Sequence, residues 1–288
     1  MPAIPVLDST MHFDERGRRR DGTTFVFLHG NPGSSHQWRH VLDRFGDGHL
    51  LAPDLIGMGR SGKPDLAYAF ADHARYLDAW FDAVGIERVV LVGHDWGGAL
   101  AFDWAARHPD RVLGVAFFES IVKPMQWGDL APQARARSEA VRTPGLGEER
   151  VLATDAFIRQ AFTGGVLTPV EGAELDAYLA PFPTPESRRP VLAWARQLPL
   201  GGEPRELVER IEAYDRWLAT SDSVPKLLLT FSGSPTLLID DAMAAWCAAS
   251  IAALEVVDGG LAGHHAQEDR PQAIADEIAR WAERHGLQ

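Results

Sequence analysis

The fold is decided by the stretch Arg88-Val89-Val90-Leu91-Val92-Gly93-His94-Asp95-Trp96-Gly97-Gly98-Ala99-Leu100. Its first half is a short apolar run rich in β-branched residues, which predicts a buried strand that stops at Gly93. A helical pattern begins at about Trp96 and continues beyond the stretch. A strand that turns so abruptly into a helix needs Gly on both sides of the turn, because a Cβ there would clash.

The turn itself, Gly93-His94-Asp95-Trp96-Gly97, has the form G-x-D-x-G. This is the form of a nucleophile elbow, with Asp in the position where Ser is more usual. The Asp95 carboxylate would stand at a helix N-terminus, where unpaired backbone N–H groups stabilise an anion. The alternative is that Asp95 only caps the helix. Glycines on both sides of the turn favour the nucleophile.

The composition indicates a globular protein. The chain has 288 residues, 45% of them hydrophobic, which is enough for a sizeable core and one or two domains. Its net charge of −12 argues against nucleic acid as a partner. The single cysteine, Cys247, excludes an intrachain disulfide framework and fits a reducing compartment, so a cytoplasmic location is expected. No apolar run is long enough to span a membrane.

Strands and helices alternate along most of the chain. Besides the strand before Gly93, strands are expected at 23–28, 49–53, 111–118, 226–231 and 254–257, those at 23–28 and 111–118 buried, with an edge strand at 11–13. Amphipathic helices are expected at 72–84, at 203–220 and from about 271. This alternation predicts an α/β protein with a doubly wound, mostly parallel sheet.

The composition changes between residues 122 and 202. Strand-like runs disappear there, and prolines accumulate among short helical pieces such as 155–162. We interpret residues 122–202 as a helical cap domain, inserted into a core domain made of residues 1–121 and 203–288.

Four polar residues follow predicted strands, at the edge of the sheet where catalytic groups gather in this type of fold. They are Asn31, Asp95, Glu119 and His264. His264 lies in a Gly-rich loop that can carry its imidazole over the sheet as a base. The alternatives are a surface histidine or a metal site shared with His265. Adjacent histidines point apart on an extended backbone, and no third histidine or cysteine accompanies them, so no metal is expected.

A carboxylate nucleophile needs a base to release its ester, an acid to orient that base, and an oxyanion hole. Glu119 ends the strand after the elbow, and the next strand has no acid after it until Asp240, so Glu119 is favoured over Asp240. Asn31 precedes Pro32 and could simply form a turn. Its backbone N–H could instead join that of Trp96 in the oxyanion hole. The side-chain amide of Asn31 and the indole of Trp96 are neutral donors that suit a large, soft leaving anion.

Together these motifs resemble the haloalkane dehalogenases, α/β-hydrolases of the subgroup whose triad acid follows the strand after the elbow. The segments that carry the resemblance are 29–32, 53–59, 93–98, 118–119, 225–228 and His264 with 267–269. The likeness spans almost the whole chain. The motif His-Asp-Trp-Gly-Gly alone is shared with epoxide hydrolases.

The resemblance implies a mechanism in which Asp95 displaces halide from carbon and forms an alkyl ester. Asn31 and Trp96 would bind the halide and form the oxyanion hole. His264, oriented by Glu119, would activate the water that releases an alcohol. No metal or organic cofactor is needed. The implied partners are a small halogenated hydrocarbon, water and halide ion, without nucleic acid or membrane, and a monomer is expected.

The resemblance also assigns pocket walls. The matching positions are Trp127, Phe157, Ala161, Phe162, Trp194, Leu198, Leu238 and His265. His265 is often an aromatic or apolar residue in relatives, and Thr163-Gly164-Gly165 stands where relatives often carry Pro. These departures leave the substrate range open.

Three other functions share the predicted fold. An epoxide hydrolase would need two cap tyrosines, but only Tyr178 lies within the cap and Tyr214 lies beyond it. A coelenterazine-type luciferase or monooxygenase would share the triad. A non-catalytic binding protein would have no need of an intact triad.

Overall fold

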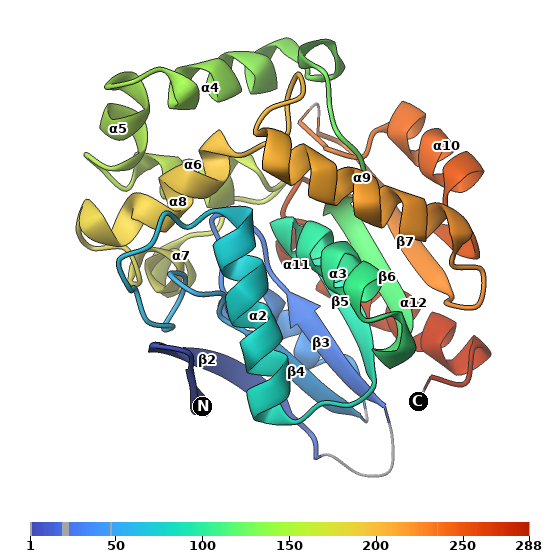
Figure 1. Cartoon of the computed structure of the whole chain (residues 1–288). Helices are drawn as coiled ribbons and strands as arrows, with labels where there is room; N and C mark the ends of the chain where they lie inside the picture. The colour runs from blue at the N-terminus through green and yellow to red at the C-terminus, as the bar shows by residue number, and fades with distance from the viewer. Residues whose placement is uncertain (1, 19–22, 47, 235, 288) are drawn as a thin grey trace.

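A computed structural model of the chain describes residues 2–18, 23–46, 48–234 and 236–287. Within these residues, eight strands form one sheet in the order β1-β2-β4-β3-β5-β6-β7-β8 (Figure 1). The strands are β1 (Ala3–Val6), β2 (Ser9–Arg16), β3 (Thr24–Leu28), β4 (His49–Pro53), β5 (Val89–Asp95), β6 (Val112–Ser120), β7 (Lys226–Ser232) and β8 (Leu254–Leu261). The pairs β1–β2 and β2–β4 are antiparallel and the other pairs are parallel, which confirms the predicted mostly parallel sheet.

The predicted edge strand was placed wrongly. Residues 11–13 belong to β2, and β1 pairs with its outer side through Ile4 and Met11. The prolines beside Ile4 weaken the strand pattern in the sequence, yet a proline is tolerated on an edge strand because one side of that strand needs no partner.

Helices cover both faces of the sheet, as expected for a doubly wound fold. The α-helices outside residues 122–202 are α1 (Arg39–Leu42), α2 (Phe70–Val84), α3 (Trp96–Arg107), α9 (Arg205–Thr220), α10 (Asp241–Ser250), α11 (Ala266–Asp269) and α12 (Pro271–Arg284). In Figure 1, α2, α3 and α9 lie in front of the sheet and α12 lies behind it. Each face has its own apolar core, centred on residues such as Trp104 in front and Trp281 behind.

Residues 122–202 contain further helices between β6 and α9. They are α4 (Pro132–Arg142), α5 (Leu146–Val151), α6 (Ala156–Gly164), α7 (Gly172–Leu179) and α8 (Arg189–Arg196). We call these residues the cap segment. In Figure 1 the arrowheads of β3 and β6 point toward it, so the carboxyl ends of the central strands face the cap segment. Its status as a separate domain stays a prediction.

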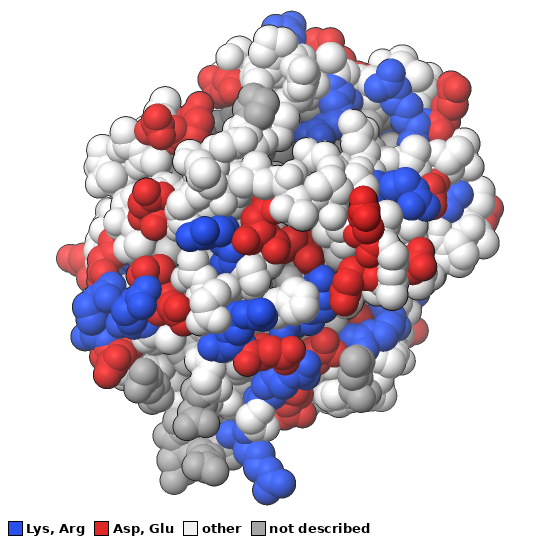
Figure 2. All heavy atoms as spheres, turned by 180° about the vertical axis from the view of Figure 1, so that it is seen from behind, with Lys and Arg blue, Asp and Glu red and all other residues white. Residues whose placement is uncertain are grey.

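Two further properties concern membrane spans and surface charge. No helix among the described residues is long and apolar enough to cross a lipid bilayer. On the face shown in Figure 2, acidic and basic side chains are interspersed rather than gathered by sign.

Candidate active site

The elbow forms where the sequence predicts it, because β5 ends at Asp95 and α3 begins at Trp96. A Cβ on Gly93 would lie 2.4 Å from the Cα of Gly98, and one on Gly97 would lie 2.0 Å from the carbonyl oxygen of Leu28. Both distances are below contact, so the turn requires glycine at both places. Asp95 itself has a φ of 53°, an unfavourable value for a residue with a side chain. Such strain is typical of functional positions.

The Asp95 carboxylate is buried at the carboxyl end of β5, where two backbone N–H groups bind it. The backbone N–H of Asn31 donates to Oδ2 at 2.8 Å, and the backbone N–H of Trp96 also donates to the carboxylate. Burial raises the pKa of Asp95, while the nearby His264 and these two N–H groups oppose the increase. The two donors form the arrangement expected of an oxyanion hole.

His264 and Glu119 meet across the sheet edge. Nδ1 of His264 donates to Oε2 of Glu119 at 2.9 Å, and both side chains lie largely out of solvent. Burial alone would lower the pKa of His264, but the Glu119 hydrogen bond and the negative charges of Asp95 and Glu119 outweigh it, so that the pKa is raised. Because Nδ1 of His264 bonds to Glu119, Nε2 is the nitrogen available for proton transfer.

Two backbone groups that sequence reasoning missed hold Glu119 in place. The N–H of Leu238 donates to Oε2 at 2.8 Å and that of Ile239 donates to Oε1 at 3.2 Å. Asp240, the rival acid, instead accepts from the backbone N–H of Met243 at 2.8 Å and caps α10. The geometry therefore brings Glu119 to His264 and keeps Asp240 on its own helix. Backbone donors of this kind leave no sequence pattern that could have identified them.

The side chains of Asn31 and Trp96 lie where the loop after β3 and the elbow meet the cap segment. Nδ2 of Asn31 donates to the carbonyl oxygen of Val191 in α8 at 3.2 Å. The indole of Trp96 packs against that of Trp194, also in α8, with 4.4 Å between ring centroids. Residues of the cap segment thus fix the orientation of both expected halide-binding side chains.

The predicted pocket walls lie in four places, and one of them, Trp194, is the ring that packs against Trp96. Leu198 and Leu238 line one cavity, described below. Phe162 of α6 packs against His265 beside His264, with 4.6 Å between ring centroids, and Phe157 and Ala161 of α6 are partly buried. Trp127 packs beneath the guanidinium of Arg142, at 5.1 Å, and the described contacts do not bring it to the triad.

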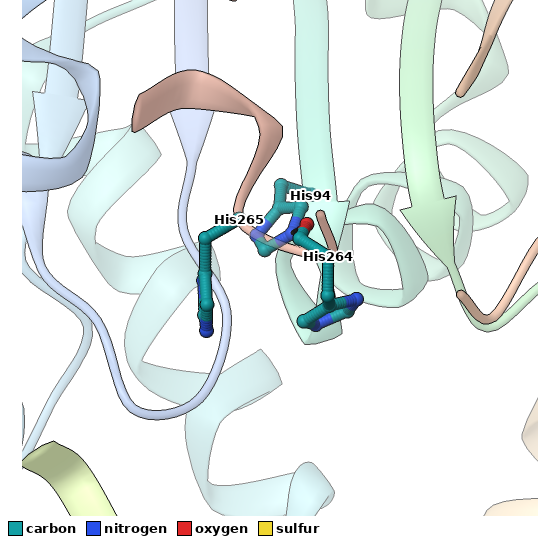
Figure 3. A group of neighbouring side chains, drawn as sticks. All are labelled: His94, His264 and His265. Atoms are coloured by element: carbon teal, nitrogen blue, oxygen red, sulfur yellow. Dashed lines mark hydrogen bonds between the residues drawn. The ribbon is translucent and has the colours of Figure 1, made fainter. Parts of the chain in front are cut away.

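Three histidines cluster at the site, which corrects one argument drawn from the sequence. His264 and His265 do have a third histidine beside them, because His94 of the elbow lies close to both (Figure 3). The separation of 170 residues between His94 and His264 hides this contact in the sequence. One nitrogen from each ring lies within 4.8 Å of the others, a geometry that could hold a metal ion.

Four of the six ring nitrogens in this cluster nevertheless bond to other partners, including both nitrogens of His94. His94 donates from Nε2 to the carbonyl oxygen of His264 at 2.8 Å and accepts at Nδ1 from Nε2 of Gln37 at 3.2 Å. The same Gln37 nitrogen lies 3.1 Å from Nδ1 of His265. Ligation by His94 would break either its bond to Gln37 or its bond to the carbonyl oxygen of His264. The cluster therefore fits a hydrogen-bonded support for the base better than a metal centre.

Tyrosine hydroxyls are all engaged away from Asp95. The chain contains four tyrosines. Tyr178 of the cap segment donates to Glu268, and Tyr214 of α9 donates to the carbonyl oxygen of Ile121 at 2.6 Å. The remaining two, Tyr68 and Tyr76, donate to Pro64 and Asp8. No tyrosine hydroxyl is therefore placed to protonate an epoxide.

Comparisons with known proteins agree with this geometry. The family model described as alpha/beta hydrolase fold matches residues 23–271. A haloalkane dehalogenase of Mesorhizobium japonicum is 47% identical, covering 96% of this chain and 89% of the relative. One of Bradyrhizobium diazoefficiens is 44% identical, covering 96% and 92%. Among solved structures, the haloalkane dehalogenase DbeA of Bradyrhizobium elkani has a TM-score of 0.94 at 44% identity, covering 99% of this chain and 98% of that one.

The fold and the matched family model define the class: the chain belongs to the α/β-hydrolase fold family. Within that class, identities above 40% over nearly the whole length place it among the haloalkane dehalogenases. The comparisons do not favour the epoxide hydrolase and luciferase alternatives.

Proposed function

We propose that the protein hydrolyses small haloalkanes through an alkyl ester on Asp95. The observation that carries this proposal is the assembly of one carboxylate, its two backbone donors and the His264–Glu119 pair at the carboxyl ends of β5 and β6. The family to which the chain belongs supports the same reaction.

In the first step, Asp95 attacks the halogen-bearing carbon. Oδ2 is held by the N–H of Asn31, so Oδ1 is the attacking atom. A bond forms between Oδ1 and carbon while the carbon–halogen bond breaks, and its electron pair leaves with the halide. The second amide hydrogen of Asn31 and the indole N–H of Trp96 stabilise the departing halide, because hydrogen-bond donors act where negative charge develops.

In the second step, His264 acts as the base. Its Nε2 takes a proton from water, whose oxygen attacks the carboxyl carbon of Asp95, and negative charge develops on Oδ2 between the N–H groups of Asn31 and Trp96. Collapse of this intermediate releases the alkoxide, which His264 protonates. The hydrolysis yields an alcohol, halide and a proton, and Asp95 is regenerated as a carboxylate.

We also infer three broader properties. The cap segment forms a domain that closes the pocket, which is supported by its contacts with Asn31 and Trp96. The protein acts as a monomer in the cytoplasm, a view supported by its net charge of −12 and its one cysteine, Cys247, which is buried. Light scattering at several concentrations tests the monomeric state, because a molar mass near twice 31.6 kDa would contradict it.

One screen tests the reaction. Purified protein is incubated with 1-bromobutane and 1-iodobutane, and separately with styrene oxide and with coelenterazine. Halide release with formation of butanol is expected. Diol formation without halide release would favour the epoxide hydrolase, and light emission without halide release would favour the luciferase.

A further inference from the structure

A cavity of about 380 Å³ lies between α4 of the cap segment and the loop that leads into α10. Two of its lining residues, Leu198 and Leu238, are predicted pocket walls. Leu238 also donates its backbone N–H to Glu119, which binds His264. The cavity therefore lies next to the Glu119 side of the triad, and Leu198 and Leu238 give this part of its wall apolar side chains.

Four charged residues line the same cavity, and three of them have partners. Lys123 lies over the ring of Trp246 at 4.4 Å. The carboxylates of Asp129 and Asp240 accept backbone N–H groups at 2.7 and 2.8 Å. Arg137 is the exception, because its guanidinium has no hydrogen bond or ion pair within the described part of the chain.

The charge of Arg137 reaches the reaction centre. Its side chain is open to solvent on one side, yet it is crowded enough that burial lowers its pKa, while the Asp95 carboxylate acts in the opposite direction. The Arg137 charge in turn lowers the pKa of His264 and of His265. An unpaired cation thus lies on α4, in the wall of a cavity that adjoins the triad.

Given the proposed function, on which this inference rests, we propose that Arg137 binds the terminal carboxylate of a haloalkyl substrate. The substrate class is an ω-halocarboxylate: its halogen end lies at Asp95, its methylene chain runs along Leu198 and Leu238, and its carboxylate meets Arg137. A guanidinium presents paired N–H donors that match the two oxygens of a carboxylate. Among the described residues, none accepts a hydrogen bond from Arg137.

The test compares charged and neutral substrates of matched length. Halide release is measured for ω-bromocarboxylates from 6-bromohexanoate to 10-bromodecanoate, beside the corresponding 1-bromoalkanes. In Arg137→Gln, kcat/KM for the preferred bromocarboxylate is expected to fall roughly tenfold or more, mainly through KM, since a charge-assisted contact is lost. The 1-bromoalkane is expected to change less than about twofold. Arg137→Lys should retain part of the preference.

A neighbouring arginine supplies the control. Arg135 lies on α4 but pairs with Glu139 at 2.9 Å, so Arg135→Gln removes the same charge outside the cavity and should leave both substrates unchanged. Equal losses for charged and neutral substrates in Arg137→Gln would overturn the inference, as would a wild-type enzyme that hydrolyses only the neutral series. Failure of the wild type on both series would overturn the proposed function as well.

Discussion

The triad and the outer part of the cavity hold their charged groups in opposite ways. Glu119 accepts two backbone N–H groups and one imidazole, and Asp95 accepts two backbone N–H groups. Arg137, across the cavity, has no such partner among the described residues. Groups that stabilise developing charge work best when they are fixed before the reaction begins. A group that recognises substrate keeps its hydrogen bonds for the ligand, and the following substitutions test this division.

The largest effect is expected from His264→Phe. Asp95 and its donors remain, so the first step proceeds, but the water has no base and the ester persists. Multiple turnover should vanish after one halide is released per active site. Intact mass spectrometry after exposure to 1-bromobutane should show a single butyl adduct. A folded variant whose Asp95 stays unmodified would contradict the roles given to both residues.

Glu119→Gln should lower turnover by roughly 10⁴-fold, by analogy with the loss of the acid in a serine triad. Its shape is kept, but the charge that stabilises the His264 imidazolium is gone. Asp240→Asn is the matched control, because Asp240 caps α10 and should change turnover little. Steady-state halide release measures both. The assignment of the acid would be wrong if the two variants exchanged these results.

Trp96→Phe should lower kcat/KM by about tenfold to a hundredfold, because one donor to the departing halide is lost. The decrease should be larger for 1-chlorobutane than for 1-iodobutane, since chloride concentrates its charge more. Trp194→Phe is the control: it keeps a ring against Trp96 and leaves the Trp96 indole N–H intact. A similar loss in both variants would indicate that packing, and not the indole donor, matters.

The pH dependence should follow His264. The Glu119 hydrogen bond and charge raise the pKa of His264, so the neutral base is lost as pH falls through this raised pKa, and ester hydrolysis should decrease about tenfold per pH unit below it. Glu119→Gln removes the hydrogen-bonded carboxylate that raises this pKa, so the acid limb of that variant should move to lower pH. Single-turnover hydrolysis between about pH 5 and pH 9 measures both limbs. An acid limb that stays in place in the variant would contradict the cause assigned to the shift.

The fold was predictable from sequence because the local rules agree with the tertiary structure. Apolar runs became buried strands, and the glycines of the elbow marked a turn that only glycine fits. The strand-end positions of Asn31, Asp95, Glu119 and His264 converge in space because the central strands are parallel and share one edge.

Contacts between distant segments were not predictable in the same way. The backbone donors to Glu119 come from residues 238 and 239, which have no motif. His94 contacts His264 and His265 only through the tertiary fold. No local feature distinguishes Arg137 from the other charged residues of its polar helix. These features depend on which side chains the fold brings together, and no local periodicity encodes that.

The smallest effect is expected from His265→Phe. His265 is a direct neighbour of the base, but burial lowers its pKa well below 6.5, so it is neutral when the enzyme works and its removal takes no charge from the site. Phenylalanine can keep the stacking on Phe162. The one interaction lost is that with Gln37, a buried side chain whose amide would keep only His94 as a partner. One unsatisfied donor costs about 1–3 kcal/mol, so thermal unfolding should begin a few degrees lower. Turnover should change only a few-fold, and the acid limb should stay where it is in the wild type. If the acid limb of His265→Phe moved, His265 would carry charge in the working enzyme and would act on the pKa of His264 through that charge.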